Sequence, residues 1–209
     1  MFSLIKKLFK KEESLVEEKD VMKKFLIVGL GNIGAEYENT RHNIGFKILD
    51  ALAGASNISF SPDRYADKAE YSLKGRKIIL IKPATYMNLS GKAVHYWLQK
   101  ENVPLSHLLV VLDELALPFG AIRIKTKGSD GGHNGLKNIQ QLLGRQDYAR
   151  LRFGIGSDYS KGMQVQYVLG EWDEIQKKNL PSRIQLVTQA IESFVLAGPQ
   201  LTMTQFNGK

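Results

Sequence analysis

The chain has 209 residues, of which 43% are hydrophobic and 24% are charged, and its formal net charge is +8. A chain of this length suits one globular domain, because it can bury roughly 70% of its unfolded surface. Cysteine is absent, which excludes a disulfide framework, a thiolate nucleophile and cysteine-based zinc sites, and it fits a cytoplasmic protein. The positive charge favours a polyanionic partner, although a basic solvated surface would give the same balance.

The first 22 residues differ from the rest of the chain. They hold five lysines and five acidic residues, so the net charge of +8 belongs to residues 23–209. Their apolar side chains recur at helical spacing, at Phe2, Ile5, Leu8 and Phe9. This spacing is typical of a short amphipathic helix that touches a membrane surface or a partner. The alternative is a mobile extension, or a start codon placed upstream of the true one. We therefore expect residues 23–209 to form the domain, with no membrane required.

Short apolar runs alternate with amphipathic stretches from residue 23 onward. Buried strands are predicted at residues 25–28, 77–81 and 108–112, and further strands at 151–156 and 163–169. Helices are predicted at about 43–53, 91–100 and 134–143, with a C-terminal helix that starts near Pro181. Strands that alternate with helices indicate an α/β fold, a single-domain three-layer sandwich whose mixed, mostly parallel sheet is flanked by helices.

Polar residues follow three of the predicted strands directly. Asn32 comes after the first strand, Asn88 after the second, and Asp113 after the third. If the three strands are parallel neighbours, their carboxyl ends lie side by side, and this edge is where α/β proteins usually place their chemistry.

The glycine loop at residues 29–34 fits the dinucleotide pattern G-x-G-x-x-G and follows a strand. A dinucleotide site also needs a helix that begins within the glycines, so that its N-terminus meets the pyrophosphate. Here residues 35–41 carry two acidic side chains and no apolar stripe, and Asp50 falls inside the later helix. We therefore expect no nicotinamide or flavin cofactor.

Two of the four histidines stand in glycine-rich or polar loops that lead into helices. These are His42 and His133, whereas His95 is expected to be structural in an apolar helix and His107 to lie on the surface. Histidine is the natural general base for hydrolysis near neutral pH, and Asp113 could orient it through one ring nitrogen. The plainer alternatives are a helix-capping neighbour for His42 and a loop cap for Asp113.

Other catalytic arrangements lack their parts. The chain has no G-x-S-x-G nucleophile elbow and no His-Glu-x-x-His pattern, and Ser90 is expected to cap the helix that follows it. We expect no metal site. Four asparagines lie at strand ends or in turns, at Asn32, Asn43, Asn88 and Asn134. Each can be a simple turn former, but an amide also donates to an oxyanion and binds peptide backbone.

Six short stretches resemble, in order, those of the bacterial peptidyl-tRNA hydrolase family. They are Val28-Gly29-Leu30-Gly31-Asn32 with Gly34 and Tyr37, Thr40-Arg41-His42-Asn43, Met87-Asn88-Leu89-Ser90-Gly91, Asp113-Glu114-Leu115, Gly131-Gly132-His133-Asn134-Gly135-Leu136 and Leu151-Arg152-Phe153-Gly154-Ile155-Gly156. The resemblance implies a metal-independent esterase that frees tRNA from peptidyl-tRNA, usually monomeric and without a cofactor.

The resemblance also implies roles for single residues. His42 would be the general base on water, Asp113 its orienting partner, and Asn32 a group that holds the water and the reacting ester. Asn88 and Asn134 would bind the ester carbonyl and the peptide, and the channel would be lined by Tyr37, Met87 and His133. Lys125 and Arg152 match positions linked to the tRNA.

Two positions depart from the family pattern. Ile33 stands where proline is common, and Ala116 where a second acidic residue is common. A non-catalytic RNA-binding protein of the same fold is the main competing hypothesis, but such a protein has no need for the intact set of His42, Asp113 and Asn32.

Overall fold

The computed structural model describes residues 23–209. The sequence predictions for residues 1–22 lie outside this range. Within it, the fold is the α/β sandwich that the sequence predicts, built on one seven-stranded sheet with the order β2-β3-β4-β1-β5-β7-β6.

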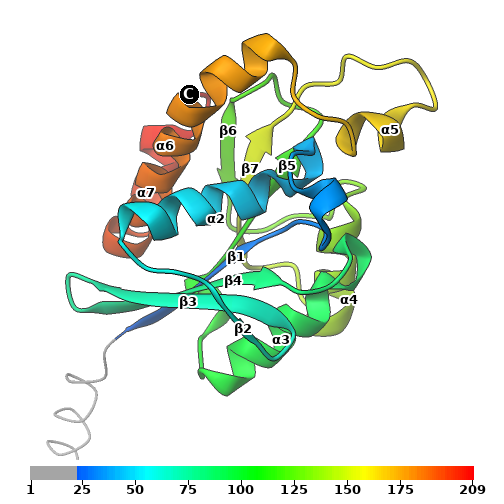
Figure 1. Cartoon of the computed structure of the whole chain (residues 1–209). Coiled ribbons are helices and arrows are strands. Elements are labelled where there is room, and N and C mark those ends of the chain that lie inside the picture. The colour runs from blue at the N-terminus through cyan, green and yellow to red at the C-terminus, as the bar shows by residue number, and fades with distance from the viewer. Residues whose placement is uncertain (1–22) are drawn as a thin grey trace, which may run out of the picture.

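The centre of the sheet is parallel and its edges are antiparallel, so the sheet is mixed (Figure 1). The four central strands are β1 (Lys24–Gly29), β4 (Arg76–Pro83), β5 (Leu108–Glu114) and β7 (Ala149–Gly154). The edges are β2 (Ser61–Asp63), β3 (Ala66–Leu73) and β6 (Ile122–Lys125). The central strands are buried on both faces, which explains why they read as nearly continuous apolar runs.

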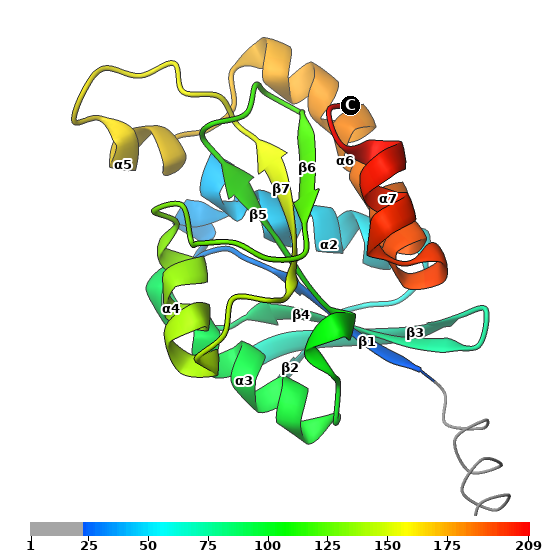
Figure 2. The ribbon, with the colours of Figure 1, turned by 180° about the vertical axis from the view of Figure 1, so that it is seen from behind.

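Helices cover both faces of the sheet, which Figures 1 and 2 show from opposite sides. One face carries α2 (Ile44–Ala55), α6 (Glu174–Ala197) and α7 (Pro199–Phe206), with the core around Ile48 and Phe194. The other carries α3 (Ser90–Lys100) and α4 (Asn134–Leu143), with the core around Trp97 and Leu136. We call this second side the α3–α4 face.

Two sequence predictions about the C-terminal third are wrong. Residues 163–169 do not form a strand. Most of them form a short helix, α5 (Gln164–Val168), which has no buried residue. The long helix starts at Glu174 and not near Pro181, which lies inside it. The true start has a capping box. The Asp173 side chain accepts the backbone N–H of Gln176, and the Gln176 side chain accepts the backbone N–H of Asp173.

The remaining elements are short and carry weak patterns. Between residues 23 and 209, four 3₁₀ turns lie in the loops: η1 (Ala35–Tyr37), η2 (Arg41–Asn43), η3 (Met87–Leu89) and η4 (Leu105–His107). Strands β2, β3 and β6 and helix α7 were not predicted from the sequence. Across residues 23–209, the helices are all too short or too polar to cross a lipid bilayer.

Candidate active site

The helix that follows the glycine loop lies unusually close to the sheet. A Cβ atom on Gly45 would come within 2.4 Å of the backbone N and O of Leu30 and within 2.7 Å of the carbonyl oxygen of Val111. Because real Cβ atoms do not approach backbone so closely, only glycine allows this contact between α2, the end of β1 and β5. The close approach places His42, three residues earlier, against the carboxyl end of β5.

The same loop excludes the dinucleotide alternative. After Gly34 the chain makes the turn η1, and the first long helix, α2, begins only at Ile44. Asp50 lies within α2, as the sequence indicates. No helix N-terminus of this loop therefore faces the glycines in the way that a pyrophosphate requires.

His42, Asp113 and His133 form one hydrogen-bonded cluster. His42 Nδ1 lies 2.8 Å from Asp113 Oδ1, and His133 Nε2 lies 3.0 Å from the same oxygen atom. Asp113, at the end of β5, is only 3% exposed. Three segments far apart in the sequence thus converge on one buried carboxylate oxygen.

The protonation of His133 follows from its second ring nitrogen. His133 is the N-cap of α4, and its Nδ1 accepts the backbone N–H groups of Gly135 and Leu136, at 3.1 and 3.4 Å. A nitrogen that accepts these bonds carries no hydrogen. The ring hydrogen is therefore on Nε2, which donates it to Asp113.

This arrangement fixes the tautomer of His42. Asp113 accepts at Oδ1, so His42 carries its hydrogen on Nδ1 and donates it to the carboxylate. The lone pair on Nε2 is then available to accept a proton. Burial alone would lower the pKa of His42, but the charge and hydrogen bond of Asp113 outweigh it and raise the pKa above the ordinary 6.5. Burial alone would raise the pKa of Asp113, but the two histidines hold it well below its usual range.

The cluster also has the composition of a metal site, since one potential ligand atom from each residue lies within 4.8 Å of the others. The backbone bonds to His133 Nδ1 disagree with that use. A metal on Nε2 would leave both ring nitrogens without hydrogen, which demands an imidazolate anion. A ring with its hydrogen on Nε2 fits a chain of hydrogen bonds to Asp113 better.

Asn32 is oriented by two backbone groups at the end of β1. Its side-chain oxygen accepts a hydrogen bond from the backbone N–H of Met87 at 2.8 Å. The backbone N–H of Asn32 donates to Asn43 Oδ1, and the backbone C=O of Asn32 accepts from Asn43 Nδ2, both at 2.9 Å. The Asn32 oxygen is committed to this contact, so its amino group is the part that can donate to a ligand. Asn43 therefore has a structural role that secures Asn32.

Met87 links the two other asparagines. Met87 is buried, and a Cβ atom on Gly135 would come within 2.8 Å of its Sδ. The turn η3 therefore packs directly on the start of α4. Asn88 follows Met87 on η3 and Asn134 precedes Gly135 on α4, and both asparagine side chains are exposed. Ser90 does not cap α3 as expected, because it is buried and donates to the Met87 carbonyl at 2.8 Å.

A hollow of about 100 Å³ opens beside the cluster, lined by His42, Asp113, His133 and Asn134. Three residues of α5 also line it, namely Gln164, Val165 and Val168. Sequence reasoning missed them because it assigned this stretch to a strand. A larger hollow of about 650 Å³ lies between α2 and α6 and contains none of the predicted site residues.

Comparison with known proteins shows the family of the chain. The family described as "Peptidyl-tRNA hydrolase" matches residues 26–209. The chain belongs to this family. It is similar to the "Peptidyl-tRNA hydrolase" of Phocaeicola vulgatus, at 60% identity over 89% of this chain and all of that one, and to that of Bacteroides fragilis, at 57% over the same shares. Among solved structures it resembles peptidyl-tRNA hydrolase from Acinetobacter baumannii, with a TM-score of 0.83, 33% identity, and coverage of 90% of this chain and 96% of that one.

The remaining residues singled out from the family resemblance are not part of the cluster. Tyr37 lies on η1, in the loop that leads to His42. Lys125 is exposed at the end of β6. Arg152 on β7 pairs with Glu114 and donates to the Ser129 carbonyl at 3.2 Å, so a phosphate would compete with a carboxylate there.

The other two histidines lie outside the site. His95, expected to be structural in an apolar helix, is on the exposed side of α3, 3.2 Å from Gln99. His107 is half-buried, stacked on Phe25 with ring centroids 4.3 Å apart. Of the two departures from the family pattern, Ile33 is 41% exposed and Ala116 is exposed, so neither changes the buried cluster.

Proposed function

We propose that this protein hydrolyses the ester that joins a peptide to the terminal ribose of a tRNA, with His42 as general base. The observation that carries this proposal is the 2.8 Å contact between His42 Nδ1 and Asp113 Oδ1. The Nδ1 hydrogen of His42 is committed to Asp113, which leaves Nε2 as a proton acceptor with a raised pKa. A general base for water needs this arrangement of orienting acid and free lone pair.

The reaction divides into two proton transfers. A water molecule attacks the ester carbonyl while His42 Nε2 takes its proton, and the carboxylate of Asp113 stabilises the imidazolium that forms. The tetrahedral intermediate then expels the ribose oxygen, which receives the proton from His42. The products are a peptide with a free carboxyl group and a tRNA with a free 3′ hydroxyl.

The asparagine amides suit the neutral part of this substrate. The Asn32 amino group, whose partner oxygen is fixed by Met87, would hold the water or donate to the oxyanion. Asn88 and Asn134, brought together by the packing of η3 on α4, would bind the ester carbonyl and the peptide backbone. Tyr37, Met87 and His133 would shape the channel.

The basic side chains suit the anionic part. Lys125 would contact phosphates of the tRNA, and Arg152 would join it where Glu114 releases the guanidinium. Such contacts position the RNA and carry little sequence information. We further propose that the protein works as a monomer in the cytoplasm, without a metal or cofactor and without a membrane.

The test is release of tRNA from an N-blocked aminoacyl-tRNA, with free aminoacyl-tRNA as the control substrate and with or without a chelator. The proposal expects cleavage of the blocked substrate that resists the chelator. A folded protein that binds tRNA but cleaves neither substrate would favour the non-catalytic RNA-binding alternative.

A further inference from the structure

A pair of cations surrounds Tyr65, in the turn between β2 and β3. The guanidinium carbon of Arg64 lies 5.2 Å from the centroid of the Tyr65 ring, and Lys92 Nζ lies 4.6 Å from it. Nearby Lys100 pairs with Asp63 and Lys68 with Glu70. Arg64 and Lys92 form no such ion pair within residues 23–209, and both are exposed. We call Arg64, Tyr65 and Lys92 the Tyr65 corner.

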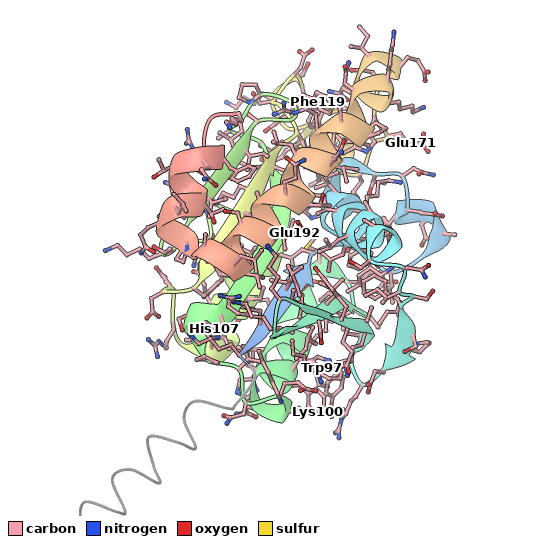
Figure 3. The ribbon with its side chains drawn as sticks, turned by 90° about the vertical axis from the view of Figure 1, so that its left-hand side faces the viewer. Trp97, Lys100, His107, Phe119, Glu171 and Glu192 are labelled. Carbon is pink, nitrogen blue, oxygen red and sulfur yellow. The ribbon has the colours of Figure 1, made fainter. Side chains whose placement is uncertain are left out.

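The corner is held in place by the core beneath it. Tyr65 has a φ of +64°, a conformation that aromatic residues rarely adopt. Buried Trp97 donates from Nε1 to the Arg64 carbonyl at 3.0 Å, and the N–H of Ala84 donates to the Tyr65 carbonyl at 2.9 Å. Figure 3 shows Trp97 and Lys100 together on α3.

Two like charges therefore lie against the same ring, and within residues 23–209 neither forms an ion pair, although the Asp63 carboxylate accepts the backbone N–H of Arg64 at 2.6 Å. The hydrogen bond from Arg64, together with the charges of Arg64 and Lys92, lowers the pKa of Tyr65, which reflects the positive potential. Cations held together in this way repel each other, and an anion placed between them removes the repulsion.

The corner lies at the carboxyl ends of the parallel strands, as the catalytic cluster does. Ala84, which bonds Tyr65, begins the loop that leads to Met87, and Lys92 stands four residues after Asn88. The start of α3 also packs on α4, where Gly91 donates to Asn138 at 2.8 Å.

Lys125 points to the same side of the sheet. Its strand neighbours Ile122 and Ile124 belong to the opposite core, and side chains alternate along a strand. The Tyr65 corner and Lys125 therefore flank the α3–α4 face from its two sides.

We propose that the Tyr65 corner binds phosphates of the unpaired 3′ strand of the tRNA, an inference that rests on the proposed function. The peptide part of the substrate varies in sequence and charge, so a fixed pair of cations would favour some peptides and hinder others. The 3′ strand is shared by all tRNAs and carries one negative charge per nucleotide, which a fixed pair of cations can match. It is also the strand that carries the ester to His42.

The experiment measures binding of deacylated tRNA, and of the same tRNA shortened by its unpaired 3′ nucleotides, over a range of salt. The test variant combines Arg64→Ala with Lys92→Ala. The matched control combines Lys23→Ala, just before the amino end of β1, with Lys178→Ala on α6, which covers the opposite face, and both of these lysines are exposed. Loss of two single-strand phosphate contacts reduces the salt slope by about 1.4, which weakens binding about tenfold at 0.15 M salt.

The inference expects the shortened tRNA to bind the wild type more weakly, and the test variant to bind both RNAs with the same reduced affinity. Lys92→Ala alone should reduce the slope by about 0.7. Equal additional loss on both RNAs would overturn the assignment to the 3′ strand. Unchanged tRNA binding with altered cleavage of substrates that carry acidic peptides would assign the corner to the peptide instead. Because binding is measured without turnover, failure of the proposed hydrolysis would be seen separately.

Discussion

Replacing Asp113 with asparagine tests the link between His133 and the catalytic tautomer. In the native protein, both histidines donate to Asp113 Oδ1. His133 cannot reverse its role, because its Nδ1 is occupied by two backbone N–H groups. The new amide must therefore keep its oxygen toward His133, since the opposite orientation would face an N–H with an NH₂ group.

The expected loss is accordingly small for such a buried residue. With the oxygen in place, His42 still donates from Nδ1 and keeps Nε2 as the base. Only the charge disappears, and a charged hydrogen bond is stronger than a neutral one by about 1–2 kcal/mol, or roughly 5- to 30-fold in rate. Reversal of the histidine tautomer in a comparable pair costs about 10⁴-fold.

A second substitution should release the full effect. His133→Asn keeps a good N-cap for α4 but is too short to retain the contact with Asp113, so alone it should cost only a few-fold, about the loss of one hydrogen bond. In the double variant nothing holds the amide, its NH₂ group turns to His42 Nδ1, and Nε2 becomes protonated. We expect a loss of about 10⁴-fold, far beyond the product of the single losses.

The assay is kcat/KM for an N-blocked aminoacyl-tRNA, measured for the wild type, both single variants and the double variant. Circular dichroism and thermal unfolding check that each protein is folded. A loss near 10⁴-fold for Asp113→Asn alone, or simple multiplication of the single effects, would refute the control of the amide by His133.

Further predictions concern pH, RNA binding, metal and packing. Because Asp113 raises the pKa of His42, and the protonated ring cannot accept a proton, kcat/KM should fall on the acid side with a midpoint above 6.5, and a flat profile from pH 5 to 8 would contradict this. Lys125→Ala should weaken tRNA binding and reduce its salt slope by about 1, with kcat unchanged. Chelator treatment should leave the rate unchanged, and a loss restored by a divalent cation would contradict the chain of hydrogen bonds to Asp113. Gly45→Ala should lower the free energy of unfolding by about 1–3 kcal/mol in denaturant titration, since its Cβ has no space, and an unchanged value would contradict the close contact with Leu30.

Much of the site could be predicted because it depends on strand ends. The apolar runs of β1, β4 and β5 mark parallel central strands, and the polar residues that follow them meet at one edge. This topology brings the ends of β1 and β5 together, and the close contact at Gly45 then places His42 beside Asp113. The family resemblance supplied the names of further site residues, but not their bonds.

The parts that could not be predicted depend on contacts distant in sequence. The tautomer of His133 is set by the backbone of α4, and a histidine acting as an N-cap has no distinct sequence pattern. Helix α5 was assigned to a strand because its apolar residues alternate, although it packs beside the site and not in the sheet. Pro181 suggested a helix start because proline favours the first turn, yet the capping box at Asp173 sets the boundary.

The central claim is that His42 accepts the proton of the attacking water. It is tested most directly by tRNA release from an N-blocked aminoacyl-tRNA with His42→Ala, beside His95→Ala as a matched control on the exposed side of α3. The account predicts a loss of about 10²–10⁴-fold or more in turnover for His42→Ala, with the Kd for tRNA unchanged and the control fully active. Turnover close to that of the wild type, or parallel loss of turnover and tRNA binding, would contradict it.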